Sequence, residues 1–193
     1  MVDVQVERAQ APARRRFDVD DYYQLAEAGI LRPDERVELV DGDVIAVSPQ
    51  GSPHAAVVSR LTRILLPVFG ARALLRAQLP LRLGRHSEPE PDVALVSFRA
   101  DDYVSGHPTA EDALLVIEIG VTSLAFDRAV KAPLYARHGV PELWLVDLAG
   151  RTVHVLREPG PDGFAREETL GPDQQLAVPG FPDLVLHVRD VVP

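Results

Sequence analysis

The feature that most constrains the fold is an uninterrupted apolar run at residues 113–119, with the sequence ALLVIEI. A continuous run of this kind is typical of a strand that is buried on both faces, as in a sheet covered by helices on both sides. The run ends on Glu118-Ile119, and a carboxylate cannot stay ionised in an apolar core without a partner. Glu118 is therefore the first candidate functional residue.

The remaining pattern predicts an α/β (α+β) fold in which helices pack on a central mixed β-sheet. Helices are expected over 18–29, from Ser52 onward and over 126–138, with Pro67 kinking or ending the second and Pro133 distorting the third. Further strands are expected at 36–40, 44–48, 72–76, 79–83, 91–97, 143–147, 152–156, 165–170 and 183–187. The pattern contains no linker, so we expect one domain over 17–193, preceded by a flexible polar tail over 1–16.

Composition excludes several classes of protein. The 193 residues include no cysteine, which excludes a disulfide scaffold, a thiolate zinc site and a cysteine nucleophile, and suits a cytoplasmic protein. No uncharged apolar run approaches the roughly 18 residues that a membrane span needs. The N-terminus has no apolar core of the kind that a secretory signal requires.

Charge is distributed unevenly along the chain. The formal net charge is −9, which taken alone argues against a nucleic-acid partner. Between Val44 and Ser87, however, there is no acidic residue, and the stretch contains six arginines, including Arg60 and Arg63. Such a stretch can hold a polyanion, or its arginines can simply be the solvated ends of helices and strands. These two readings have about equal weight.

Asp92 lies directly after Pro91, at the mouth of another apolar strand. If this strand is a neighbour of the strand that carries Glu118, the two acids meet at one edge of the sheet. Paired carboxylates there suit Mg²⁺, which takes oxygen ligands and keeps several waters. The alternative is that each acid pairs with a nearby arginine, or that Asp92 caps a turn.

Lys131 is the single lysine among 20 basic residues. Asp127, Lys131 and Tyr135 are spaced four residues apart, so on a helix they form one stripe. Because this helix begins a few residues after Glu118, we expect its first turns to lie near the same sheet edge. The alternative is an ordinary surface pair between Asp127 and Lys131.

Three segments resemble a large bacterial family of "putative restriction endonucleases" in the PD-(D/E)xK nuclease superfamily. They are RVELVDGDVIAVSPQGSPHAAVVSRL at 36–61, PEPDVALV at 89–96 and VIEIGVTSLAFDRAVKAPLYARHGVPELWLVDL at 116–148. The pieces are individually short, but their order and spacing are specific, and the resemblance covers most of residues 18–190.

The resemblance implies a restriction-endonuclease-like core and a Mg²⁺-dependent endodeoxyribonuclease, with Mn²⁺ as a substitute for the metal. Asp92 and Glu118 match the metal-binding acids, and the main-chain carbonyl of Ile119 is implied as a further ligand. The superfamily lysine is expected two residues after Glu118, where this chain has Gly120, and Lys131 matches its migrated position on the following helix.

The resemblance also extends to auxiliary residues and to assembly. Glu38 resembles the acid that precedes the core motif in many such nucleases and completes the predicted catalytic set. Superfamily members commonly pair to cut two strands, so the resemblance leads us to expect a homodimer or a higher homo-oligomer. Residues predicted to contact DNA or to support the site are His54, Gln78, Asp127, Tyr135, Arg60 and Arg63.

Two rival functions remain open at this point. The first is an inactive nuclease-like scaffold that serves as a binding or assembly module, which the net charge and the missing lysine at Gly120 favour. The second is a glycosidase that uses two carboxylates. It ranks lower because such an enzyme needs an aromatic-lined cleft, and the chain is only 6% aromatic.

Overall fold

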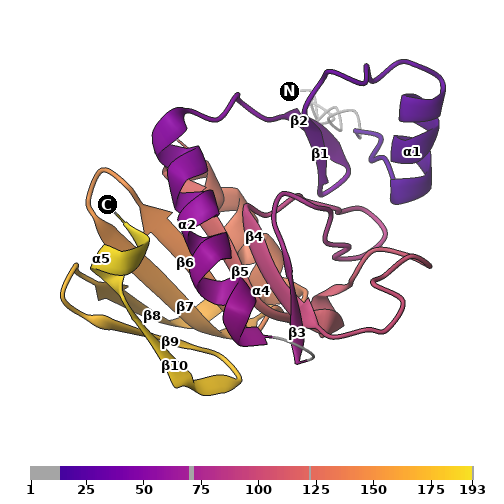
Figure 1. Ribbon diagram of the computed structural model, residues 1–193. Helices are drawn as coiled ribbons and strands as arrows, with labels where there is room; N and C mark the ends of the chain where they lie inside the picture. Colours follow the sequence, from indigo (N-terminus) through magenta and orange to yellow (C-terminus); the bar gives the residue numbers. More distant parts are fainter. Residues whose placement is uncertain (1–13, 70–71, 122, 193) are drawn as a thin grey trace, which may run out of the picture.

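The computed structural model describes residues 14–69, 72–121 and 123–192. Its centre is a six-stranded mixed sheet with the strand order β3-β4-β5-β6-β7-β8 (Figure 1). These strands are β3 (Ala73–Arg76), β4 (Val93–Ser97), β5 (Ala113–Gly120), β6 (Glu142–Asp147), β7 (Thr152–Gly160) and β8 (Gly163–Leu170). Strands β5 and β6 run parallel, whereas the other neighbouring pairs of this sheet are antiparallel. The predicted α/β architecture with a central mixed sheet flanked by helices is confirmed.

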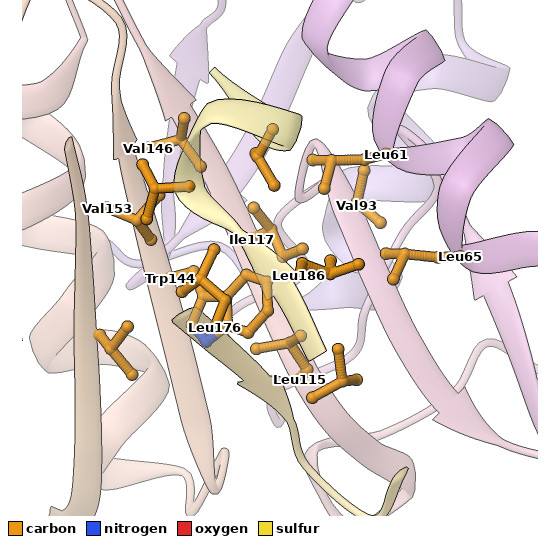
Figure 2. Close-up of a cluster of buried hydrophobic side chains, with 14 of the residues drawn as sticks. Leu61, Leu65, Val93, Leu115, Ile117, Trp144, Val146, Val153, Leu176 and Leu186 are labelled. Carbon is orange, nitrogen blue, oxygen red and sulfur yellow. The ribbon is translucent and has the colours of Figure 1, made fainter. Parts of the chain in front are cut away.

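Helices cover both faces of the sheet. The long helix α2 (Ser52–Phe69) packs on one face, together with the hairpin of β9 (Gln175–Val178) and β10 (Phe181–His187) and the short helix α5 (Val188–Val191) (Figure 1). Figure 2 shows this core, in which Leu61 and Leu65 of α2 approach Ile117 of β5. The opposite face carries α4 (Ala132–Arg137).

Alternation along β5 explains why both faces are buried. Leu115, Ile117 and Ile119 belong to the core under α2, and Val116 belongs to the core under α4. Since successive strand residues point to opposite faces, Glu118 lies on the α4 side. The apolar run is therefore a strand buried on both faces, as predicted from the sequence.

A crossover joins β5 to the parallel strand β6 and carries the predicted lysine helix in three pieces. It consists of α3 (Leu124–Phe126), a π-helical turn (Asp127–Lys131) and α4. The amide of Ala132 donates to the carbonyl of Asp127, five residues earlier. Pro133, which has no N–H to donate, follows this turn at once and accounts for the expected distortion.

The N-terminal part lies at one end of the molecule (Figure 1). It consists of α1 (Val19–Glu27), capped by Asp18, and the hairpin of β1 (Val37–Val40) and β2 (Asp43–Ala46). Asp41 and Gly42 have φ values of 53° and 80°, as the predicted two-residue turn requires. The amide of Glu88 donates to the carbonyl of Leu39 at 2.8 Å, which ties β1 to the loop that precedes β4.

Some elements differ from the sequence prediction. Residues 79–83 form no strand; they lie in a loop with isolated bridges, because Pro80 lacks an N–H and Gln78 has a φ of 54°. Helix α2 continues two residues past Pro67, and the short strand β9 was not predicted. Most of the predicted tail, residues 1–13, lies outside the described residues. No helix in the described residues is long and apolar enough to cross a membrane.

Candidate active site

Asp92 and Glu118 lie opposite each other at one edge of the sheet. Strands β4 and β5 are antiparallel with Val93 opposite Ile117, so the residue before β4 faces the residue after Ile117. The main-chain amide of Asp92 donates to Oε2 of Glu118 at 3.4 Å, and the amide of Ile119 donates to Oδ2 of Asp92 at 2.8 Å. The two acids thus converge, as their places in the two strands predicted.

The partners of Asp92 occupy one of its oxygens more fully than the other. Its Oδ2 atom lies 2.9 Å from Nε2 of His54 in addition to the Ile119 amide. From the described residues its Oδ1 atom accepts a single long hydrogen bond, from Nε2 of Gln50 at 3.3 Å. Oδ1 therefore keeps room for another ligand.

Glu118 shows the same division between its two oxygens. Oε1 accepts from the Tyr135 hydroxyl at 2.6 Å and from Nζ of Lys131 at 3.1 Å. Among the described residues Oε2 has one weak bond, from the Asp92 amide at 3.4 Å. The side chain is buried, with 3% of the residue exposed. Burial raises the pKa of Glu118 to about 8, against the opposing effect of the Lys131 ammonium.

Lys131 is clamped between two carboxylates from distant parts of the chain. Its Nζ atom lies 2.9 Å from Oε2 of Glu38 and 3.1 Å from Oε1 of Glu118. Burial alone would lower the pKa of Lys131, but the charges of Glu118 and Glu38 outweigh burial and raise the pKa above its ordinary value. The π-helical turn places Asp127 nearby, and burial raises the pKa of Asp127 although Lys131 opposes this shift.

These side chains line a cavity of about 320 Å³. Its wall contains five acids against two permanent cations, Arg36 and Lys131, so a negative charge prevails in it. The five acids are Glu38, Glu90, Asp92, Glu118 and Asp127. Burial, followed by the charge of Glu38, raises the pKa of Glu90. Such a cavity favours a cation and resists a phosphate that arrives without one.

The donor set fits a hard divalent cation. No three histidine, aspartate or glutamate side chains in the part of the chain that is described form a ready-made metal cage. Mg²⁺ needs no such cage, because it is usually held by one or two carboxylates and keeps several of its waters. Oδ1 of Asp92 and Oε2 of Glu118 are the oxygens with capacity left for it.

The predicted supporting residues fall into two groups. His54, in the first turn of α2, and Asp127 line the cavity, while Tyr135 reaches the same centre through Glu118. Within the described residues the buried Nδ1 atom of His54 has no hydrogen-bond partner. Gln78 reaches the centre through a second amide, since its Nε2 atom donates to Oε1 of Gln50 at 2.5 Å.

Arg60 and Arg63 form the second group and do not line the cavity. They lie on α2 beyond His54, half-buried and exposed respectively. Elsewhere in the arginine-rich stretch, Arg82 pairs with Glu88 at 2.6 Å and Arg85 pairs with Asp18 at 3.0 Å. For these two, the ordinary structural reading of the charge pattern is correct.

Gln50 and Glu90 are among the cavity residues that the sequence analysis missed. Both stand inside the quoted family-like segments, SPQGSP and PEPD, so their places were visible. A neutral glutamine in a loop and an acid beside a proline carry no chemical signal until the fold shows what they face. Glu90 enters the cavity because the loop that leads to Asp92 passes along its wall.

Comparisons with known proteins show the family of the chain and a solved structure of similar fold. A family model described as "Putative restriction endonuclease" matches residues 19–189. A crystal structure of "a putative nuclease belonging to DUF820" from Anabaena variabilis superposes with a TM-score of 0.65 at 22% identity, covering 91% of this chain and 97% of that one. Curated proteins yielded no match. With the family model spanning nearly all of the described chain, the protein belongs to the Uma2 family of putative restriction endonucleases.

Proposed function

We propose that this protein is a Mg²⁺-dependent endonuclease that hydrolyses phosphodiester bonds of DNA, with Mn²⁺ able to replace Mg²⁺. The observation that carries the proposal is the meeting of Asp92 and Glu118, each with one underused carboxylate oxygen, beside the ammonium of Lys131. The family supports a nuclease, and the choice of DNA follows from the restriction endonucleases for which it is named.

Each residue of the centre has a distinct task in this proposal. Asp92 and Glu118 hold the cation, and the main-chain carbonyl of Ile119 is a further candidate ligand. The chemistry that Mg²⁺ would supply at these carboxylates is polarisation of the scissile phosphate and activation of a water. The hydrogen bonds from Ile119 and His54 to Asp92 and from Tyr135 to Glu118 fix the direction in which the two carboxylates present their remaining oxygens.

Lys131 acts as a cation and not as a base. Glu118 and Glu38 raise its pKa, so it stays protonated at neutral pH. In that state the ammonium offers hydrogen bonds to the attacking water and to the negative charge that grows on the phosphate. Glu38, from β1, holds the ammonium in place from the other side at 2.9 Å.

The test is the nicking of supercoiled plasmid DNA with Mg²⁺, with Mn²⁺ and with a chelator. We expect cleavage by the parent with either metal, and a loss of at least about 100-fold in Asp92→Asn and Glu118→Gln. Asp183→Asn and Glu111→Gln are matched controls, because these acids are exposed and outside the cavity. A folded parent that cuts DNA with neither metal would favour the inactive scaffold.

Assembly is a separate part of the proposal. By resemblance to nucleases that cut both strands we expect a homodimer. Light scattering at several protein concentrations measures this directly. A mass of one chain at all concentrations, with nicking retained, would limit the protein to single-strand cuts.

A further inference from the structure

A chain of two glutamine amides ends on the oxygen of Asp92 that has capacity left. Gln50 lies in the link between β2 and α2, and its Oε1 atom accepts from Nε2 of Gln78 at 2.5 Å. The Nε2 atom of Gln50 donates to Oδ1 of Asp92 at 3.3 Å. Gln50 lines the cavity, and neither the nuclease chemistry nor the sequence motifs give it a task.

The chemistry of the neighbours fixes which way the Gln50 amide points. An ionised carboxylate only accepts hydrogen bonds, so the group that Gln50 turns toward Asp92 must be its NH₂. The carbonyl then faces Gln78, which supplies the matching donor. Because the oxygen of the Gln50 amide is already held, its NH₂ group has a fixed direction. Ligand binding then costs little additional side-chain entropy.

Gln78 is itself anchored to the same strand end. Its main-chain amide donates to the carbonyls of Pro91 at 3.1 Å and of Asp92 at 3.2 Å. Its backbone lies in the left-handed region with a φ of 54°, which a side chain seldom adopts without compensating contacts. These bonds fix Gln78 relative to Asp92, and the side chain of Gln78 in turn holds the Gln50 amide.

The bond from Gln50 to Asp92 is weak for a charged pair. At 3.3 Å it is longer than the 2.7–2.9 Å of a good charge-assisted hydrogen bond. It also occupies the carboxylate oxygen that a cation would take. Among the described residues the Gln50 NH₂ group, which has two N–H bonds, has this one acceptor. A donor is thus aimed into the cavity beside the proposed cation.

We propose that Gln50 is a substrate-positioning residue whose NH₂ group donates to a non-bridging oxygen of the scissile phosphate, with Gln78 fixing its direction. The inference rests on the proposed nuclease function and deepens it. It adds a neutral donor to a cavity in which acids prevail, at the Asp92 oxygen that has capacity left for the cation. A neutral donor binds phosphate oxygen without competing with the cation for the carboxylates.

A mere brace for Asp92 is the competing role for Gln50, and it predicts a different effect on the metal. If Gln50 only steadies the carboxylate, its removal weakens metal binding. If Gln50 binds substrate, its removal leaves metal affinity unchanged or raises it, because a competing donor to Oδ1 has gone. Metal titration in the absence of DNA separates these roles.

The experiment uses the full chain and the variants Gln50→Ala, Gln78→Ala and the double variant, with Gln24→Ala as the control. Gln24 is an exposed helical glutamine far from the cavity lining. Alanine at 78 retains a Cβ, so the backbone strain there is little changed. For each protein we would measure three quantities: kcat/KM for plasmid nicking, the affinity for Mn²⁺ by titration calorimetry, and the temperature of thermal unfolding.

We expect Gln50→Ala to lower kcat/KM by about 10- to 100-fold, the size expected for a hydrogen bond to a charged group. Gln78→Ala should lose less, and the double variant should be no slower than Gln50→Ala, because Gln78 acts through Gln50. Mn²⁺ affinity should not fall in any of them. Nicking by Gln50→Ala at the parental rate, or a loss of Mn²⁺ affinity that matches the loss of rate, overturns this inference and leaves the nuclease function intact. A parent that nicks with neither metal overturns both.

Discussion

The Nζ atom of Lys131 lies 3.1 Å from Oε1 of Glu118, although the lysine belongs to the helix that follows the strand of Glu118. The sequence resemblance leads us to expect a lysine two residues after the acid, where this chain has Gly120. A Cβ atom at 120 would come within 2.9 Å of the Cα and backbone nitrogen of Leu124, so α3 leaves no space for a side chain there. The close approach of α3 excludes the usual lysine position, and the π-helical turn supplies the ammonium in its place.

This geometry predicts that a lysine introduced at position 120 cannot take over the role of Lys131. We expect Lys131→Met to lose at least about 100-fold in plasmid nicking, and Gly120→Lys in that background to restore nothing while lowering the melting temperature. Losing the cation leaves two buried carboxylates unpaired, so folding is checked by circular dichroism near pH 6, where Glu118 takes up a proton. Recovery of nicking in the double variant would contradict the steric argument.

The raised pKa of Glu118 predicts how the metal-free protein responds to pH. The folded pKa of about 8 exceeds the ordinary value of 4.5, so folding takes up a proton between these values. The free energy of unfolding therefore falls as pH rises from about 5 to 8, by up to about 1.4 kcal/mol per pH unit, and this contribution is flat above 8. Urea denaturation across this range should show the fall in the parent and a smaller one in Glu118→Gln. Equal slopes in both proteins would refute the assignment to Glu118.

The same proton competes with the cation. Mg²⁺ binds the ionised form of Glu118, so we expect its affinity to rise as pH increases toward 8. Titration calorimetry at pH 6, 7 and 8 measures the Mg²⁺ affinity. The number of protons released on binding should fall as the pH approaches 8, because less of Glu118 is then protonated.

Tyr135 and Tyr23 allow a comparison of two equally short hydrogen bonds, of which the first is buried and the second only partly buried. Each hydroxyl donates to a glutamate at 2.6 Å, Tyr135 to Glu118 inside the centre and Tyr23 to Glu88 outside the cavity. Both Tyr→Phe variants should lose about 1–3 kcal/mol of unfolding free energy. Only Tyr135→Phe should also slow nicking, by roughly tenfold, because the Glu118 carboxylate loses a group that orients it. An equal slowing in Tyr23→Phe would point to general destabilisation instead.

Arg60 and Arg63 remain predicted phosphate contacts, and salt dependence tests them. Replacing both with glutamine should weaken DNA binding and reduce the slope of log affinity against log salt by about two. Arg151→Gln/Arg166→Gln removes the same charge from exposed positions on the β7–β8 side. Binding is measured by fluorescence anisotropy, with Ca²⁺ in place of Mg²⁺ to suppress cleavage. An equal change in both double variants would mean that net charge, and not a docking surface on α2, governs affinity.

The sequence predicted the elements whose signal is local or periodic. The run at 113–119 indicated a strand buried on both faces, and Pro133 indicated a distorted helix, because these effects depend on neighbours in the chain. The strand expected at 79–83 is absent because Pro80 cannot donate to a sheet and because the backbone of Gln78 is left-handed, which its residue type does not indicate.

Site residues could be predicted from the sequence where a charged residue lies within or beside an apolar segment. Asp92 and Glu118 were visible because acids are costly in buried strands, and Lys131 because it is the single lysine. Gln50 was not visible, because a polar residue in a loop is ordinary and its contact with Asp92 spans 42 residues. The ion pairs of Arg82 with Glu88 and of Arg85 with Asp18 were not predictable from the sequence either, because only the fold brings these partners together.

The account as a whole depends on one divalent ion sharing Asp92 and Glu118. Anomalous scattering from a crystal of the protein soaked in Mn²⁺ tests this most directly. We expect a single strong peak within coordination distance of Oδ1 of Asp92 and Oε2 of Glu118, and its loss in Asp92→Asn. A peak bound elsewhere, or none at saturating Mn²⁺ with both carboxylates ordered as described, would contradict the proposed centre.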